Sequence, residues 1–250
     1  MTTGGLTLTA VQAAFALALL YGGGELLVRG ASALALRLGV SPLAVGLTVV
    51  AFGTSLPELV VSLDAALSGA NDISTGNVVG SNIANIALIL GLAALLRPIA
   101  VESKVVRLDV PISIGVSLVL VGVLANGEAS SLEGALLVIG LAGYTGFTFW
   151  ESRRETRSVR DELAAATPAP LGGVAIHVVQ VSGGLVALVA GGHLLVVAAV
   201  ALAGSLGLSE AAIGLTVVAV GTSLPELATT VVASLRGRGD IAVGNVVGSN

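Results

Sequence analysis

The 250-residue chain is 55% hydrophobic and only 10% charged, carries a net charge of −4 and contains no cysteine. Soluble globular domains carry about 25% charged residues, so this composition excludes a protein with a fully water-exposed surface and predicts lipid as the solvent. The lack of cysteine excludes disulfides and thiolate metal sites within these residues. The net charge gives no indication of a nucleic-acid partner.

Apolar segments of about the length that spans a bilayer recur along the chain. In chain order they cover 7–36, 42–68, 74–96, 108–125, 132–150, 173–204, 211–235 and 241 onward. Leu and Ala dominate them, which favours helices, and the alternation typical of membrane β-strands is missing. The sequence therefore predicts an all-α polytopic membrane protein with about seven to eight transmembrane helices, embedded in a lipid bilayer.

Lys and Arg residues outside these segments occur on every second connection only. They are Arg37, Arg97, Lys104, Arg107, Arg153, Arg154, Arg157, Arg160, Arg236 and Arg238. The intervening connections hold Asp72, Glu128, Glu133 and Glu210 and no basic residue. By the positive-inside rule, we expect the N-terminus outside and the 151–171 loop in the cytoplasm. A compact chain without a large loop is consistent with a prokaryotic inner membrane.

One phrase occurs twice, as "AFGTSLPELVVS" at 51–62 and "AVGTSLPELATT" at 219–230, and "GNVVGSN" follows each copy. A gapless offset of 168 residues places 40–82 on 208–250. We interpret 1–150 as a first repeat with its motif at 40–85, 151–171 as a linker, and 172–250 as an incomplete second repeat. Five spans separate equivalent points, so the copies have opposite orientations, as in the inverted-repeat transporters whose substrate sites lie at the bilayer midplane.

Each repeated phrase places helix-breaking residues inside an apolar span. Proline lacks an N–H and crowds the carbonyl four residues earlier, so we expect a kink or break in both spans. The residues predicted to make it are Gly53, Pro57, Gly221 and Pro225.

Polar residues within the repeats lie at helical spacing. In the second span Thr54, Glu58 and Ser62 share one face, and in the third Asn77, Ser81 and Asn85 do. The polar groups are all oxygen donors, which suit hard cations such as Ca²⁺. If Glu58 and Glu226 converge, one Ca²⁺ or two Na⁺ would neutralise them, and this hypothesis predicts obligatory exchange.

The paired "GTSLPE" phrases, each followed by "GNVVGSN", resemble the two α-repeats of the sodium/calcium exchanger family of prokaryotic type, within the calcium/cation antiporter superfamily. The resemblance covers nearly the whole chain. It implies a five-plus-five helix inverted fold, and antiport of Na⁺ against Ca²⁺ by alternating access. It implies no enzymatic activity and no cofactor beyond the transported ions. It also implies that the long helices 7–36 and 173–204 are tilted and slide during transport.

The same resemblance implies which residues bind the ions. Side-chain ligands would be Glu58, Thr54, Ser55, Ser81 and Asn85 in the first repeat and Glu226, Thr222, Ser223 and Ser249 in the second. Backbone carbonyls of Ala51, Gly80, Ala219 and Gly248 would assist them. The last ligand of the second repeat would fall at position 253, so we expect a longer natural protein.

Other functions use similar residues. An H⁺-coupled or K⁺-dependent Ca²⁺ exchanger is the main alternative, because carboxylates also bind protons. A cation channel could use the same oxygen ligands, whereas an intramembrane hydrolase is disfavoured because the G-x-S-x-G elbow is incomplete. The sequence specifies no oligomeric state.

Four charged residues that are not among the predicted ion ligands also carry expectations. Glu25 and Arg29 stand at i, i+4 in the first span and are expected to pair, although His193 replaces Glu25 in the second repeat. Asp72 and Asp240 precede equivalent helices, and we expect them to be N-terminal caps.

Overall fold

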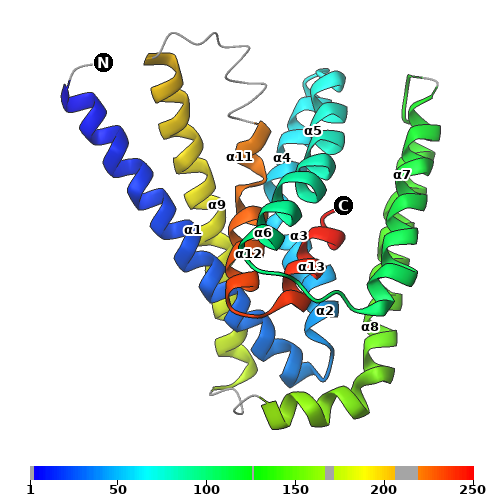
Figure 1. Cartoon of the computed structure of the whole chain (residues 1–250). Coiled ribbons are helices and arrows are strands. Elements are labelled where there is room, and N and C mark those ends of the chain that lie inside the picture. The colour runs from blue at the N-terminus through cyan, green and yellow to red at the C-terminus, as the bar shows by residue number, and fades with distance from the viewer. Residues whose placement is uncertain (1–2, 126, 167–171, 206–218) are drawn as a thin grey trace.

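The computed structural model describes residues 3–125, 127–166, 172–205 and 219–250. Every element in these ranges is helical, and three segments have π-helical hydrogen bonding (Figure 1). The elements are α1 (Thr3–Leu38), α2 (Pro42–Val45), η1 (Gly46–Val50), α3 (Ala51–Thr54), α4 (Leu56–Leu67), α5 (Asn71–Ile83), η2 (Ala84–Leu90), α6 (Gly91–Leu96), η3 (Val105–Asp109), α7 (Val110–Leu124), α8 (Ser131–Ala166), α9 (Val174–Ser205), α11 (Ala219–Thr222), α12 (Leu224–Leu235) and α13 (Gly239–Gly248).

The predicted spans correspond to helices of suitable length. In the described part, five continuous stretches are long and apolar enough to cross a membrane, and a sixth is bent by 45° between Pro42–Thr54 and Leu56–Leu67. The predicted span 211–235 corresponds to α11 together with α12, and the predicted span from 241 onward corresponds to α13. The start of the span 211–235 and the first part of the 208–250 motif lie outside the described residues. The prediction of an all-helical multi-pass membrane protein is confirmed.

Outward-facing apolar side chains show why the fold needs lipid. Helix α7 contains no buried residue, and Leu118 and Val121 are both two-thirds exposed. Water would solvate such a surface poorly, whereas a helix satisfies its own backbone hydrogen bonds and is stable in hydrocarbon.

The long helices α1 and α9 cross in close contact (Figure 1). A Cβ atom at Gly23 would lie 2.9 Å from the Gly184 carbonyl oxygen, and one at Gly191 would lie 3.0 Å from the Ala16 carbonyl oxygen. Gly23 and Gly191 are equivalent positions in the two repeats, as are Ala16 and Gly184. Small residues therefore let the two backbones touch, and they do so with the two-fold relation expected of an inverted repeat.

Helices α4 and α12 end in the same way. Gly69 and Gly237, which are equivalent, have φ values of 76° and 71°, a left-handed conformation that glycine adopts without strain. Each turn leads directly into α5 or α13. The prediction that Asp72 and Asp240 cap these helices is wrong, because the N-cap positions are Ala70 and Arg238. Both aspartates lie in the first helical turn, where a negative charge still complements the helix dipole.

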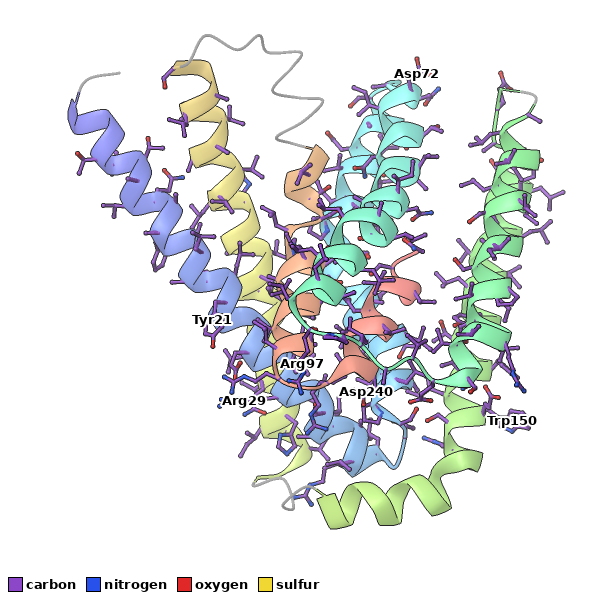
Figure 2. All side chains as sticks on the ribbon, in the orientation of Figure 1. Tyr21, Arg29, Asp72, Arg97, Trp150 and Asp240 are labelled. Carbon is purple, nitrogen blue, oxygen red and sulfur yellow. The ribbon has the colours of Figure 1, made fainter. Side chains whose placement is uncertain are left out.

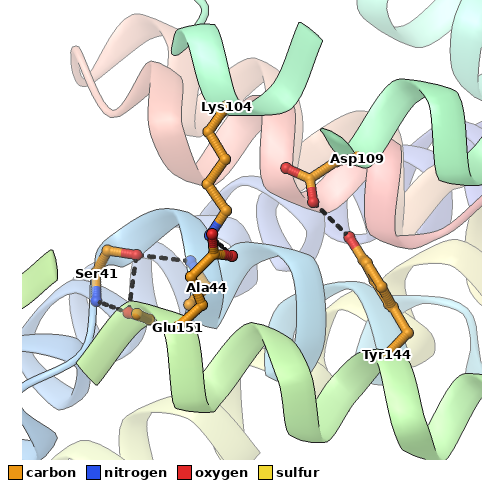
Figure 3. A network of polar contacts seen from close by, with 7 residues as sticks. Ser41, Ala44, Lys104, Asp109, Tyr144 and Glu151 are labelled. Atoms are coloured by element: carbon orange, nitrogen blue, oxygen red, sulfur yellow. Dashed lines mark hydrogen bonds and ion pairs between the residues drawn. The ribbon is translucent and has the colours of Figure 1, made fainter. Parts of the chain in front are cut away.

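A polar network attaches α8 to the rest of the bundle near one end of the molecule (Figure 3). The Ser41 N–H donates to Ser152 Oγ at 2.6 Å, and Ser41 Oγ accepts from Ala44 N–H at the start of α2. The Tyr144 hydroxyl donates to the buried Asp109 at 3.0 Å. Lys104 and Glu151 form an ion pair of 2.7 Å.

We call this end of the bundle the basic end, because Arg29, Arg97 and the last turns of α8 lie there, whereas Asp72 lies at the opposite end (Figure 2).

Candidate ion-binding site

The two repeated phrases form two equivalent helix breaks. Ser55 separates α3 from α4 with φ −83° and ψ 8°, and Ser223 separates α11 from α12 with φ −86° and ψ 9°. Pro57 and Pro225 each occupy the second position of the new helix, where a missing N–H costs nothing. The break thus leaves a serine at the junction and a glutamate in the first turn of the next helix.

Gly53 and Gly221, which precede the two breaks, leave room for α9 to pack closely. A Cβ atom at Gly53 would lie 2.6 Å from the Leu185 δ-carbons, and one at Gly221 would clash with Val196 Cγ2. Helix α9 therefore packs tightly against both broken segments.

Crossed hydrogen bonds join the two breaks. The Ser55 hydroxyl donates to Glu226 Oε1 at 2.8 Å, and the Ser223 hydroxyl donates to Glu58 Oε1 at 2.9 Å. Thr222 and Thr54 also lie within hydrogen-bonding reach of Glu58 and Glu226, respectively. Each carboxylate is therefore held by the repeat to which it does not belong, and the two glutamates converge as the hypothesis of a shared site requires.

One oxygen of each carboxylate is left for another partner. Glu58 Oε2 and Glu226 Oε2 are both buried, and neither has a hydrogen-bond partner in the described part of the chain. A buried carboxylate oxygen without a partner is costly, so these atoms are suited to bind a cation or a proton. No cluster of three or more His, Cys, Asp or Glu side chains occurs among the described residues, which leaves hydroxyls, amides and carbonyls to complete any cation shell.

Two asparagines brace the glutamate-bearing helices. Asn245 donates to the Glu226 carbonyl at 3.3 Å and to the Thr230 hydroxyl at 3.0 Å, and it accepts from Thr54 at 3.0 Å. Its equivalent, Asn77, donates in the same way to the Glu58 carbonyl at 3.1 Å and to Ser62 at 2.9 Å. From the sequence, Asn77 was predicted only to share a polar helix face, although its repetition as Asn245 at the 168-residue offset marks the two as a matched pair.

The remaining predicted side-chain ligands differ in their hydrogen bonds. Asn85 is buried and donates to Asn250 at 3.2 Å, so residues of both repeats also meet there. The Ser249 hydroxyl is buried and has no partner among the described residues. Ser81 instead donates to the Val78 carbonyl of its own helix.

The four backbone carbonyls that were predicted to bind the ions belong to helical residues. The Ala51 oxygen accepts from the Ser55 N–H and the Thr54 hydroxyl, and the Gly80 oxygen accepts from the Ala84 N–H. Ala219 begins α11. Gly248 ends α13, so close to Leu47 that a Cβ atom would clash with the Leu47 carbonyl oxygen.

Comparisons with known proteins agree on one family. A family model described as sodium/calcium exchanger protein matches residues 8–150 and 176–250. The inner membrane protein YrbG of Escherichia coli is 41% identical over 227 residues, which cover 90% of this chain and 70% of that protein. The sodium/calcium exchanger MaX1 of Methanosarcina acetivorans is 37% identical, with 91% and 75% covered. A solved structure of the sodium-calcium exchanger NCX_Mj, soaked with Na⁺ and Ca²⁺, has a TM-score of 0.82 and 34% identity, and the match covers 97% of this chain and 77% of that one.

Proposed function

Because this chain belongs to the sodium/calcium exchanger family, and is therefore a multi-pass membrane protein of a cation antiport family rather than an enzyme, we propose that it exchanges Na⁺ for Ca²⁺ by alternating access. The observation that carries the proposal is the crossed pair of hydrogen bonds, Ser55 to Glu226 and Ser223 to Glu58. These bonds bring one carboxylate from each inverted repeat to a common centre inside the bundle.

Charge balance explains how such a centre exchanges ions. The two carboxylates together carry a charge of −2, which one Ca²⁺ or two Na⁺ neutralise. A bare carboxylate within a membrane costs on the order of 3 kcal/mol or more, so the site without cations resists closure whereas the loaded site can close and reorient. Ca²⁺ and Na⁺ therefore compete for one centre, and return of the carrier requires a cation.

The proposed ligands are oxygen atoms of both repeats. We assign the ions to the two glutamates together with hydroxyl, amide and carbonyl oxygens, because Ca²⁺ takes six to eight oxygen ligands. These are Glu58, Glu226, Thr54, Ser55, Ser81, Asn85, Thr222, Ser223 and Ser249, with the carbonyls of Ala51, Ala219, Gly80 and Gly248.

The proposed location is an inner membrane, with the N-terminus outside and residues 151–171 in the cytoplasm; the prediction of a loop there is wrong for 151–166, which continue helix α8. The start of α1 and the last turns of α8 lie at opposite ends of the bundle, which supports this orientation (Figure 1). The distribution of basic residues over the connections supports it further. Residues 167–171 of the loop lie outside the described ranges.

Coupling to H⁺ or K⁺ is the second candidate. The unpartnered Oε2 atoms of Glu58 and Glu226 favour its proton-coupled form, because a proton on one of them also relieves the repulsion between the carboxylates.

Transport in proteoliposomes separates these functions. The full-length protein would be reconstituted with Na⁺ inside, and uptake of ⁴⁵Ca²⁺ would be followed with internal K⁺ or a pH gradient as controls. We expect uptake that requires internal Na⁺ and is lost in Glu58→Gln. Uptake driven by the pH gradient and indifferent to Na⁺ would replace the proposal with proton coupling, and uptake without any counter-ion would indicate a channel.

A further inference from the structure

An ion pair at the basic end connects α1 to the end of α12. Arg236, immediately after the last residue of α12, contacts Glu25 of α1 through Nε at 2.9 Å and through Nη2 at 2.7 Å (positions of α1 and α12 in Figure 1). Arg29, one turn further along α1, pairs with the same carboxylate. The expected Glu25–Arg29 pair is thus present, but it belongs to a three-residue cluster that includes Arg236.

The geometry of this contact distinguishes it from an ordinary surface ion pair. Arg236 Nε donates to Glu25 Oε2 at 2.9 Å while Nη2 lies 2.7 Å from Oε1, so one guanidinium faces both carboxylate oxygens, although only the first contact has hydrogen-bond geometry. The Glu25 side chain is only 13% exposed, whereas those of Arg29 and Arg236 are 65% and 49% exposed. The carboxylate is thus the shielded member of the cluster.

The rest of the α1–α12 contact near Glu25 is small and apolar. At Gly24, next to Glu25, a Cβ atom would lie 3.2 Å from Val232 Cγ2 and 3.4 Å from the Ala228 carbonyl oxygen. A glycine packed on Ala and Val offers no directional contact along the helix axis. The Glu25–Arg236 pair therefore supplies the directional contact that specifies how far along α12 this part of α1 lies.

This register matters because α12 carries Glu226. Arg236, the C-cap residue of α12, follows Glu226 by ten residues, or about 15 Å at 1.5 Å per residue. Arg97 holds the same helix end, donating to the Leu235 carbonyl at 3.0 Å. A displacement of α1 against α12 therefore moves it relative to one of the two carboxylates of the site.

The inverted repeat provides an internal reference. The positions equivalent to Glu25 and Arg236 are His193 on α9 and Ser68 at the end of α4. His and Ser cannot form a carboxylate–guanidinium pair. The α1–α12 contact at the basic end therefore has an ion pair that the equivalent positions on α9 and α4 cannot form. The ion pair thus stabilises one of the two pseudo-symmetric helix pairs and not the other.

We propose that the Glu25–Arg236 ion pair is a clasp that sets the register of α1 on α12, and that the two residues are positioning residues for transport. The clasp holds α1 in the position seen here and must open when α1 moves along α12. The effect of the clasp on transport rests on the proposed exchange function. The register of α1 on α12 is a structural property that can be measured without transport.

Spin labels report that register directly. These 250 residues contain no cysteine, so pairs of introduced cysteines label cleanly in this region, after replacement of any cysteine elsewhere in the full-length protein. Leu8, near the far end of α1, and Leu235, the last residue of α12, are 69% and 52% exposed and accept labels without disturbing the core. Pulsed electron–electron resonance would give the 8–235 distance distribution in proteoliposomes, with Na⁺-dependent ⁴⁵Ca²⁺ uptake measured on the same samples.

Neutralising either partner opens the clasp. Glu25→Gln and Arg236→Gln are each expected to shift or broaden the distance distribution and to change the uptake rate about 10-fold, since hydrogen bonds to charged groups of this kind correspond to one to two decades. Exchanging the charges, as Glu25→Arg with Arg236→Glu, restores the original distribution. The exchange is made in an Arg29→Gln background, so that no like charge stands one turn away. His193→Gln, at the equivalent place in the other repeat, is the matched control and leaves the distribution unchanged.

The two readouts separate the clasp from the proposed function. Single variants that are monodisperse and keep the parental distance distribution would overturn the clasp, whatever their uptake rate. A shifted distribution that the charge exchange fails to restore would also overturn it, because the residues would then act only through packing. If the parent protein takes up Ca²⁺ independently of Na⁺ but the distribution shifts and is restored as expected, the exchange function fails and the clasp stands.

Discussion

The two halves of the candidate site carry the same residues but lie in different surroundings. Glu226 is 1% exposed and Glu58 is 9% exposed. Helix α13, which follows Glu226, buries six of its residues, mainly against η1 and α12, whereas its equivalent α5 contains no buried residue; residues 214–218, the counterpart of η1, lie outside the described ranges. The repeated phrase therefore determines the break and its hydrogen bonds, but the neighbouring helices determine the dielectric environment of each half.

Because of this difference, equivalent substitutions in the two halves should reduce the free energy of unfolding by different amounts. A polar group that loses its partner costs more where water cannot replace that partner. The second-repeat half is therefore expected to be the more sensitive one wherever a substitution leaves a polar atom unpaired. Where a substitution removes charge from the shared centre, the two halves should be equivalent.

Removal of either carboxylate is the largest expected effect. Glu58→Gln and Glu226→Gln each halve the charge available to Ca²⁺, and we expect each to reduce Na⁺-dependent ⁴⁵Ca²⁺ uptake by at least about 100-fold, by analogy with losses seen when metal sites are perturbed. The measurement is initial uptake rate in proteoliposomes at matched protein content. If only one substitution abolished uptake, the two halves would not form one shared site.

Removal of the bracing asparagines should distinguish the halves most clearly. Asn245→Ala removes one hydrogen-bond partner each from the Glu226 carbonyl, Thr230 and Thr54 in a fully buried place, at a cost of about 2–3 kcal/mol. Asn77→Ala removes one hydrogen-bond partner each from the Glu58 carbonyl and Ser62 where burial is only partial, so we expect about 1 kcal/mol. Thermal unfolding in detergent measures both, and an equal loss of stability would contradict the difference in environment.

Adding a methyl group at the two glycines tests the packing of α9 on each break. In Gly221→Ala the new Cβ meets the stiff, β-branched Val196, whereas in Gly53→Ala it meets the end of the more flexible Leu185. We expect overpacking to cost about 1–3 kcal/mol at Gly221 and less at Gly53. Gly183→Ala on α9 is the control, because nothing lies within 4 Å of its Cβ position. Greater destabilisation by Gly53→Ala, measured in the same unfolding assay, would reverse this interpretation.

Much of this architecture was predictable from the sequence. Apolar length and the alternation of basic connections predicted the spans, because lipid imposes both constraints on any chain that crosses it. Pro57 and Pro225 marked where the spans bend, and the repetition of "GTSLPE" indicated that Glu58 and Glu226 belong together. These features depend on local chemistry and on the duplication itself.

The contacts that depend on three-dimensional geometry were not predictable. Which serine bonds which glutamate follows from how the repeats cross, and the crossed pairing, Ser55 with Glu226, has no signal in either copy alone. The Arg236–Glu25 pair joins residues far apart in the sequence, of which only the neighbour Arg29 stood at a recognisable spacing. The N-cap prediction at Asp72 failed because the turn after Gly69 starts the helix earlier.

The crossed serines give the smallest and most specific prediction. Ser55→Ala removes the donor to the more buried Glu226, and Ser223→Ala removes the donor to the less buried Glu58. Because each serine acts on the carboxylate of the other repeat, the first-repeat substitution should have the larger effect, the reverse of the order expected for the asparagines. We expect the Ca²⁺ concentration for half-maximal uptake to rise about 10-fold or more for Ser55→Ala and a few-fold for Ser223→Ala, in line with hydrogen bonds to charged groups. Ser55→Thr, which keeps the hydroxyl, is the control, and a larger effect of Ser223→Ala would show that burial of the carboxylate does not determine the strength of these bonds.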